Sequence, residues 1–181
     1  MVDTRDDLGD ETYFEQTRRG SDGFDARLLR EKLTVMATQR PLTLAPSNTV
    51  TEAMRAMQRE HRGCVLVTDD GTVRSKLIGI FTERDVLFRI VDKGRNPAAL
   101  PIGDVMTPNP ENLSARATVA YVLNKMSVGG FRHVPVVDDE HRPVCVISVG
   151  DVVNFLVSAF PREVLNLPEL GTTPPVSREG A

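Results

Sequence analysis

The chain contains the stretch Gly79-Ile80-Phe81-Thr82-Glu83-Arg84-Asp85 and repeats its pattern as Cys145-Val146-Ile147-Ser148-Val149-Gly150-Asp151. Each copy is an apolar run that ends in a hydroxyl residue, with a carboxylate three positions later. Upstream, residues 62–67 are echoed by residues 132–137, and residues 49–50 by residues 118–119. One structural unit has therefore been duplicated, and a site built on it is expected in two versions.

Each repeat predicts the same order of elements: strand, helix, strand, strand, helix. The first helix of each repeat has apolar residues at helical spacing, namely Val50, Ala53, Met54, Met57 and Val119, Val122, Leu123, Met126. Strands are expected at 64–67, 77–81, 134–137 and 144–147, and closing helices at 83–91 and 149–157. A short helix is also expected over about 25–32, ahead of an extended segment at 41–46.

The size of one unit predicts how the two pack. A unit of about 60 residues buries too little surface to be stable alone. We therefore expect an α/β (α+β) fold of two pseudo-symmetric β-α-β-β-α units, packed sheet to sheet.

The ordered set of motifs resembles a known family. The apolar pair, the hydroxyl and the Asp are preceded by Arg-His-Val-Pro-Val-Val-Asp at 132–138 and by an entry segment, Val105-Met106-Thr107-Pro108. This pattern is similar to the CBS domain, and two in tandem resemble a Bateman module, the nucleotide-sensing unit of that family. The resemblance implies CBS domains at 28–95 and 98–160, between an acidic leader at 1–27 and a Pro-rich tail at 161–181.

The composition is that of an ordinary soluble globular protein, with 40% hydrophobic and 26% charged residues among 181. No apolar run approaches the roughly 18 residues that span a bilayer, and the acidic first ten residues are unlike a signal peptide. We therefore expect a cytoplasmic protein without a membrane partner. Cys64 and Cys145 lie in predicted strands without Cys-x-x-Cys spacing, which predicts buried thiols and no metal site.

The charge distribution argues against nucleic acid as a partner. Residues 1–25 hold three Arg and eight Asp or Glu, a net charge of −5, which leaves +2 for the remainder of a chain of net charge −3. Neither part offers the basic stripe with interleaved aromatic residues that phosphate backbones require.

The strand–helix junctions are the candidate sites. Thr82 and Ser148 each end a strand and open a helix, where backbone N–H groups and the helix dipole favour an anion. Asp85 and Asp151, in the first turns, can accept hydrogen bonds from a vicinal diol, so each pair suits a ribose-phosphate. The alternative is a helix cap, which needs the same residues without a ligand and contributes about 1 kcal/mol. Both roles can coexist.

The resemblance assigns further residues to these sites. It implies that the hydroxyl and Asp contact ribose and phosphate, that the preceding strand contacts the base, and that the Arg-His strand start faces the phosphate. Thr107 matches a position lining the cleft of the first motif. The implied ligand-binding residues are Arg62, Ile80, Thr82, Arg84, Asp85, Thr107, Arg132, His133, Val146, Ser148 and Asp151. Because Cys145 and Ala37 replace the usual Gly and Thr, we expect the second site to match the family less well and to bind a ligand less readily than the first.

The favoured function is a stand-alone regulatory pair that binds an adenosine-type ligand (AMP, ADP, ATP, S-adenosylmethionine or a NAD-like dinucleotide) and signals to an unidentified protein partner. No enzyme activity and no required cofactor are expected, because the flanks are too short for a catalytic domain and no nucleophile–base arrangement is visible. Apolar helix faces predict a homodimer. A ligand-free dimerisation or docking module, or the regulatory subunit of an enzyme or transporter, remain as alternatives.

Overall fold

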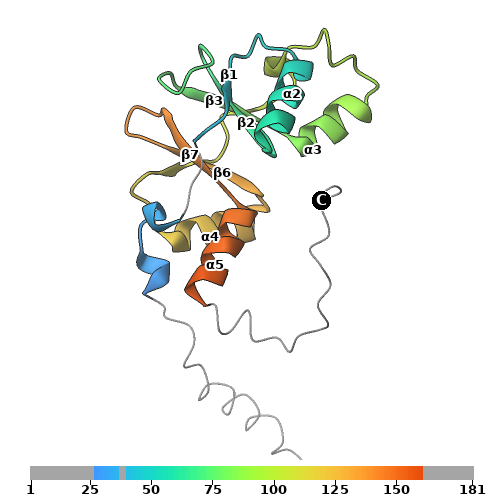
Figure 1. Ribbon diagram of the computed structural model, residues 1–181. Coiled ribbons are helices and arrows are strands. Elements are labelled where there is room, and N and C mark those ends of the chain that lie inside the picture. The colour runs from blue at the N-terminus through green and yellow to red at the C-terminus, as the bar shows by residue number, and fades with distance from the viewer. Residues whose placement is uncertain (1–26, 37–39, 161–181) are drawn as a thin grey trace, which may run out of the picture. The chain divides into compact units, whose positions relative to one another are not determined.

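The computed structural model describes residues 27–36 and 40–160. Residues 27–155 form one compact unit, and residues 156–160 are grouped with the chain ends. The predicted leader at 1–27, apart from Arg27, the Pro-rich tail and Ala37 lie outside the described residues. Both copies of the repeated motif fall inside the compact unit (Figure 1).

The first repeat follows the predicted order of elements. It contains β1 (Thr43–Leu44), α2 (Val50–Glu60), β2 (Cys64–Thr68), β3 (Leu77–Thr82) and α3 (Glu83–Asp85), which continues as the π-helix η3 (Val86–Val91). The helix expected over 83–91 is therefore present, but beyond Asp85 it is wound as a π-helix, in which backbone bonds such as Asp92 N–H to Leu87 O (3.0 Å) span five residues. In place of the helix expected over 25–32, the described residues show a 3-10 turn, η1 (Leu28–Arg30).

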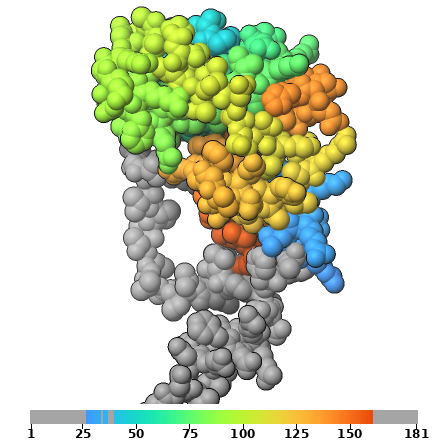
Figure 2. All heavy atoms as spheres, turned by 180° about the vertical axis from the view of Figure 1, so that it is seen from behind, coloured from blue at the N-terminus to red at the C-terminus, as the bar shows by residue number. Residues whose placement is uncertain are grey.

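The second repeat has the same order of elements, preceded by a short strand that pairs with the sheet of the first repeat. It contains β4 (Thr107–Pro108), β5 (Leu113–Ser114), α4 (Val119–Gly129), β6 (His133–Val137), β7 (Pro143–Ser148) and α5 (Val149–Ala159). Two further 3-10 turns, η2 (Leu33–Val35) and η4 (Ile102–Asp104), precede the repeats. The sheets have the orders β1-β2-β3-β4 and β5-β6-β7, so β4 completes the first sheet. Figure 2 shows the yellow-green segment around β4 merging with the green surface of the first repeat.

Two buried clusters hold the unit together, one on each face of the first sheet. Helices α2 and η3 cover one face (Figure 1), where Val65, Val67 and Phe81 meet Val50 and Ile90. On the opposite face, neighbouring residues of the same strands share a cluster with the second sheet: Cys64, Leu66, Leu77, Ile80, Val137 and Val146. Strand alternation thus sends every second side chain toward the other repeat. The predicted sheet-to-sheet packing is confirmed.

The first long helix, α2, begins at a capping box. Glu52 N–H donates to Thr49 Oγ1 (3.2 Å), and Thr49 N–H donates to Glu52 Oε2 (2.8 Å), which is a complete capping box. The matching Thr118 before α4 makes no such side-chain bond. Of the helices in the described ranges, none is long and apolar enough to cross a membrane.

Candidate ligand-binding site

The two strand–helix junctions have nearly identical internal geometry. In the first, Asp85 Oδ2 accepts from Thr82 N–H and Thr82 Oγ1, both at 2.8 Å, and Asp85 N–H donates back to Oγ1 at 3.3 Å. In the second, Asp151 Oδ2 accepts from Ser148 N–H and Oγ at 2.7 Å, and Asp151 N–H returns a bond of 3.2 Å. Both motifs are therefore helix caps. In each, one carboxylate oxygen is used by the cap and Oδ1 is left over.

A cavity of about 110 Å³ lies at the second junction. Six residues that the sequence singled out line it: Arg62, Cys64, His133, Val146, Ser148 and Asp151. Residues 40–42, His61 and Gly63 complete the wall. The cavity is built by both repeats, because the chain before β2 supplies its cationic side and the β7–α5 junction supplies the cap. No donor among the described residues bonds to Asp151 Oδ1.

The arginines at this cavity come from the first repeat and not from the strand that precedes Ser148. Sequence reasoning placed Arg132 beside Ser148, but Arg132 is exposed and does not line the cavity. Arg62 of the first repeat takes that place, with one guanidinium NH2 donating to Arg40 O at 3.0 Å. Arg84 is likewise exposed. The second junction thus receives its strand-start arginine from the first repeat.

Gly63 and His133 hold matching positions in the two repeats and meet across the cavity. A Cβ on Gly63 would lie 2.9 Å from His133 Nε2 and 3.0 Å from Cε1, so a larger residue would displace the imidazole. Burial lowers the pKa of His133, and Arg132 lowers it further, while Glu83 and Asp151 act in the opposite direction. The imidazole is therefore neutral at pH 7 in the ligand-free protein. It can gain a proton when an anion arrives.

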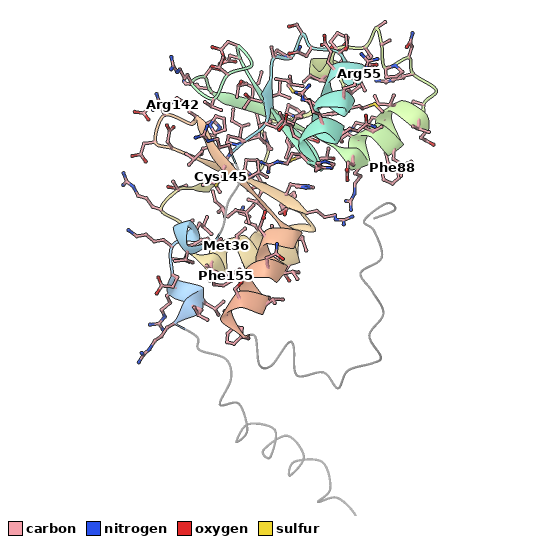
Figure 3. All side chains as sticks on the ribbon, in the orientation of Figure 1. Met36, Arg55, Phe88, Arg142, Cys145 and Phe155 are labelled. Atoms are coloured by element: carbon pink, nitrogen blue, oxygen red, sulfur yellow. The ribbon has the colours of Figure 1, made fainter. Side chains whose placement is uncertain are left out.

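The cysteines are structural. Burial raises the pKa of Cys64 to about 12, an effect that nearby Arg62 only partly offsets, so this thiol is not a nucleophile at neutral pH. Cys145 is buried, as predicted, and it is not among the residues that line the cavity. Figure 3 labels its place in the second repeat. Val146 lines the cavity, and strand alternation turns its neighbour Cys145 to the other face. Within the described ranges, no three His, Cys, Asp or Glu residues are grouped to hold a metal.

The first junction contains a residue that the sequence reasoning missed. Arg89 Nε lies 3.1 Å from Asp85 Oδ1, and its two terminal nitrogens donate to Val105 O (2.6 Å) and Thr107 Oγ1 (3.0 Å). Thr107 in turn pairs with Ile80 in the sheet. The predicted set of Ile80, Thr82, Asp85 and Thr107 is thus brought together, but around an arginine. The i,i+4 spacing of Asp85 and Arg89 was the available signal.

These features define a tandem-repeat α/β module with a polar cavity at its second strand–helix junction. The CBS domain model matches residues 32–92 and 102–158. The chain belongs to the CBS domain family, as a pair of such domains.

Relatives and solved structures agree with this assignment. The meiotically up-regulated gene 70 protein of Schizosaccharomyces pombe is 30% identical over 137 residues, which are 76% of this chain and 18% of that protein. The CBS-domain containing protein ATU1752 from Agrobacterium tumefaciens has a TM-score of 0.57 at 31% identity, over 64% of this chain and 90% of that one.

A second solved structure is similar in fold. The CBS domain pair of protein MJ0100, solved with 5-methylthioadenosine and S-adenosyl-L-methionine, has a TM-score of 0.60 at 24% identity, over 70% of this chain and 99% of that one. The chain spans only about a fifth of the length of the first curated relatives it matches.

Proposed function

We propose that this CBS pair is a regulatory module that binds one adenosyl nucleotide at the second junction. The observation that carries the proposal is the cavity in which Arg62 and His133 face the capped Ser148–Asp151 junction. A guanidinium, an imidazole that can gain a proton and a helix N-terminus are groups that bind phosphate. The free oxygen of Asp151 supplies an acceptor for a ribose hydroxyl.

The size of the cavity limits what it can enclose. At about 110 Å³, it is smaller than the roughly 300–1,000 Å³ of sites that enclose a drug-sized ligand. The proposed arrangement therefore buries the phosphate–ribose part, with the base lying along Val146. The MJ0100 pair, which was solved with two adenosyl compounds, supports this choice of ligand class by analogy of fold.

Calorimetric titration with AMP, ADP, ATP, S-adenosylmethionine and NAD tests the proposal, together with thermal unfolding. A ligand at about 100 times its Kd raises the free energy of unfolding by roughly 2.7 kcal/mol. We expect one of these compounds to bind and Arg62→Gln to weaken it at least tenfold. A matched control is Arg55→Gln, because Arg55 is exposed on α2 and away from the cavity (Figure 3). If none of the five binds, the ligand-free docking module becomes the better description.

We further propose that the module acts as a cytoplasmic homodimer that signals to a protein partner and has no catalytic activity or required cofactor. Exposed apolar side chains on the closing helices support self-association: Leu87, Phe88 and Val91 on η3, and Val149 and Val153 on α5. Phe88 projects outward from its helix (Figure 3). Light scattering should give about twice the chain mass of 19.9 kDa, and Phe88→Glu should lower that value.

A further inference from the structure

Arg89 makes more contacts than a helix-surface ion pair requires. An i,i+4 pair would explain only its contact with Asp85. Its guanidinium also donates to Val105 O, just before the edge strand β4, and to Thr107 Oγ1 in that strand, 16 and 18 residues away. One planar group, with its side chain 41% exposed, thus links Asp85 to the segment that contains β4.

We infer that Arg89 is an internal occupant of the first junction, which closes that cleft to nucleotides and limits the chain to one bound ligand. This inference rests on the proposed function. The groups through which the first junction would hold a ribose are Asp85 Oδ1 and the Thr107 hydroxyl, and Arg89 engages both. A ligand would have to displace a cation from a carboxylate whose residue is only 8% exposed.

The second junction shows what the first would be without this arginine. Phe155 of α5 stands at the position of Arg89, counted from the hydroxyl of each motif, and it has no donor to offer (Figure 3). Asp151 keeps its second oxygen available, and the cavity opens there. The helix type differs as well, since the π-helix begins directly after Asp85, whereas α5 is α-helical throughout Val149–Ala159. Such π segments are frequent at functional sites.

The test measures how many ligands one chain binds. AMP, ATP and S-adenosylmethionine are titrated separately into the wild type, Arg89→Ala, Asp151→Asn and the double variant. We expect one site in the wild type, two in Arg89→Ala, a loss of at least tenfold in affinity in Asp151→Asn, and one restored site in the double variant. Adding Asp85→Asn to Arg89→Ala should remove the new site again.

Several results would overturn the inference. Two sites in the wild type, or an unchanged number of sites in Arg89→Ala, would show that Arg89 does not block the first junction while leaving the proposed function standing. If the wild type binds none of the three compounds and Arg89→Ala binds one, the inference stands and the proposed second site fails. If neither binds, both fail. Arg89→Gln, which keeps bulk and polarity but not the charge, replaces Arg89→Ala if the latter does not fold, and Arg55→Ala controls for the loss of one positive charge.

Discussion

The two strand–helix junctions have the same cap and opposite surroundings. Both hold a hydroxyl and an Asp in hydrogen bonds that agree to within about 0.1 Å. Around the first, the remaining carboxylate oxygen is paired with Arg89, and around the second the Asp lines a cavity. The motif therefore explains how each helix begins, while residues outside the motif determine whether a ligand can enter.

The largest expected effect is a difference in nucleotide affinity between the variants of Asp151 and Asp85. Asp151→Asn should weaken nucleotide binding about tenfold to a hundredfold, because it removes the charge from a hydrogen bond of roughly 1.5–3 kcal/mol. Asp85→Asn should change affinity less than about twofold, since its free oxygen already belongs to Arg89. Titration calorimetry measures both, with thermal unfolding to confirm that each variant is folded. The opposite order of effects would place the ligand at the first junction.

A second test concerns Gly79 and Cys145, which hold matching positions on β3 and β7. A Cβ on Gly79 would fall on the Met106 side chain, 3.0 Å from Cγ and 3.1 Å from Cε. Gly79→Cys, which copies the second repeat, should lower the free energy of unfolding by about 1–3 kcal/mol through overpacking. Cys145→Ala should cost about 1 kcal/mol, the loss of one small buried group. Urea denaturation at constant m compares the two variants, and an unchanged free energy of unfolding in Gly79→Cys would mean that Met106 moves aside freely.

A third test compares the two caps as stabilising elements. Asp151→Ala removes a cap and should cost about 1 kcal/mol. Asp85→Ala removes the same cap and also leaves Arg89 without its anion, so it should cost about 0.5–1 kcal/mol more, a modest increment because Arg89 is partly solvated. Urea unfolding of both variants and of the double variant Asp85→Ala/Arg89→Ala measures the difference. If the double variant loses much more stability than Asp85→Ala alone, Arg89 is held by β4 and not by Asp85.

The sequence was sufficient for the fold because the signals were local and doubled. Helical spacing at Val50 to Met57 and the two motif strands each predicted an element that the structure contains. The π-helix was not predictable, because the residues over 86–91 have the same apolar pattern that an α-helix would have. Winding of this kind depends on tertiary contacts such as those of Arg89.

The site was predicted by residue type but not by location. The motif and the resemblance named Ser148, Asp151, His133 and Arg62, all of which line the cavity. The role of Arg89 at the first junction was not predicted, because it rests on contacts 16 and 18 residues away that no local pattern contains. Arg62 lines the cavity in place of Arg132 for the same reason, because its position there depends on packing between the repeats. Comparison of a motif with its own duplicate cannot reveal such contacts.

The smallest expected effect concerns His133, which has Gly63 as its counterpart and therefore no equivalent at the first junction. Burial holds the pKa of His133 below its usual 6.5 in the ligand-free protein, with Arg132 acting in the same direction and Glu83 and Asp151 against it. The unfolded chain thus binds more protons than the folded one just below pH 6.5, so this residue should reduce stability as the pH falls through that range. His133→Gln should remove this contribution to the slope of the free energy of unfolding against pH, which urea unfolding at several pH values measures.

Ligand affinity should depend on pH in the opposite direction to this stability effect, because a bound phosphate favours the protonated imidazole. An anion beside His133 and Arg62 raises the pKa of the imidazole, so binding takes up a proton and should strengthen as the pH falls from 8 to 6, by less than tenfold per pH unit because one group titrates. Calorimetry of AMP in two buffers of different ionisation enthalpy measures the proton uptake directly. His133→Gln should bring that uptake down to the part contributed by the phosphate itself. An unchanged uptake in this variant would mean that the phosphate does not reach His133, and that the ligand lies farther out along Val146.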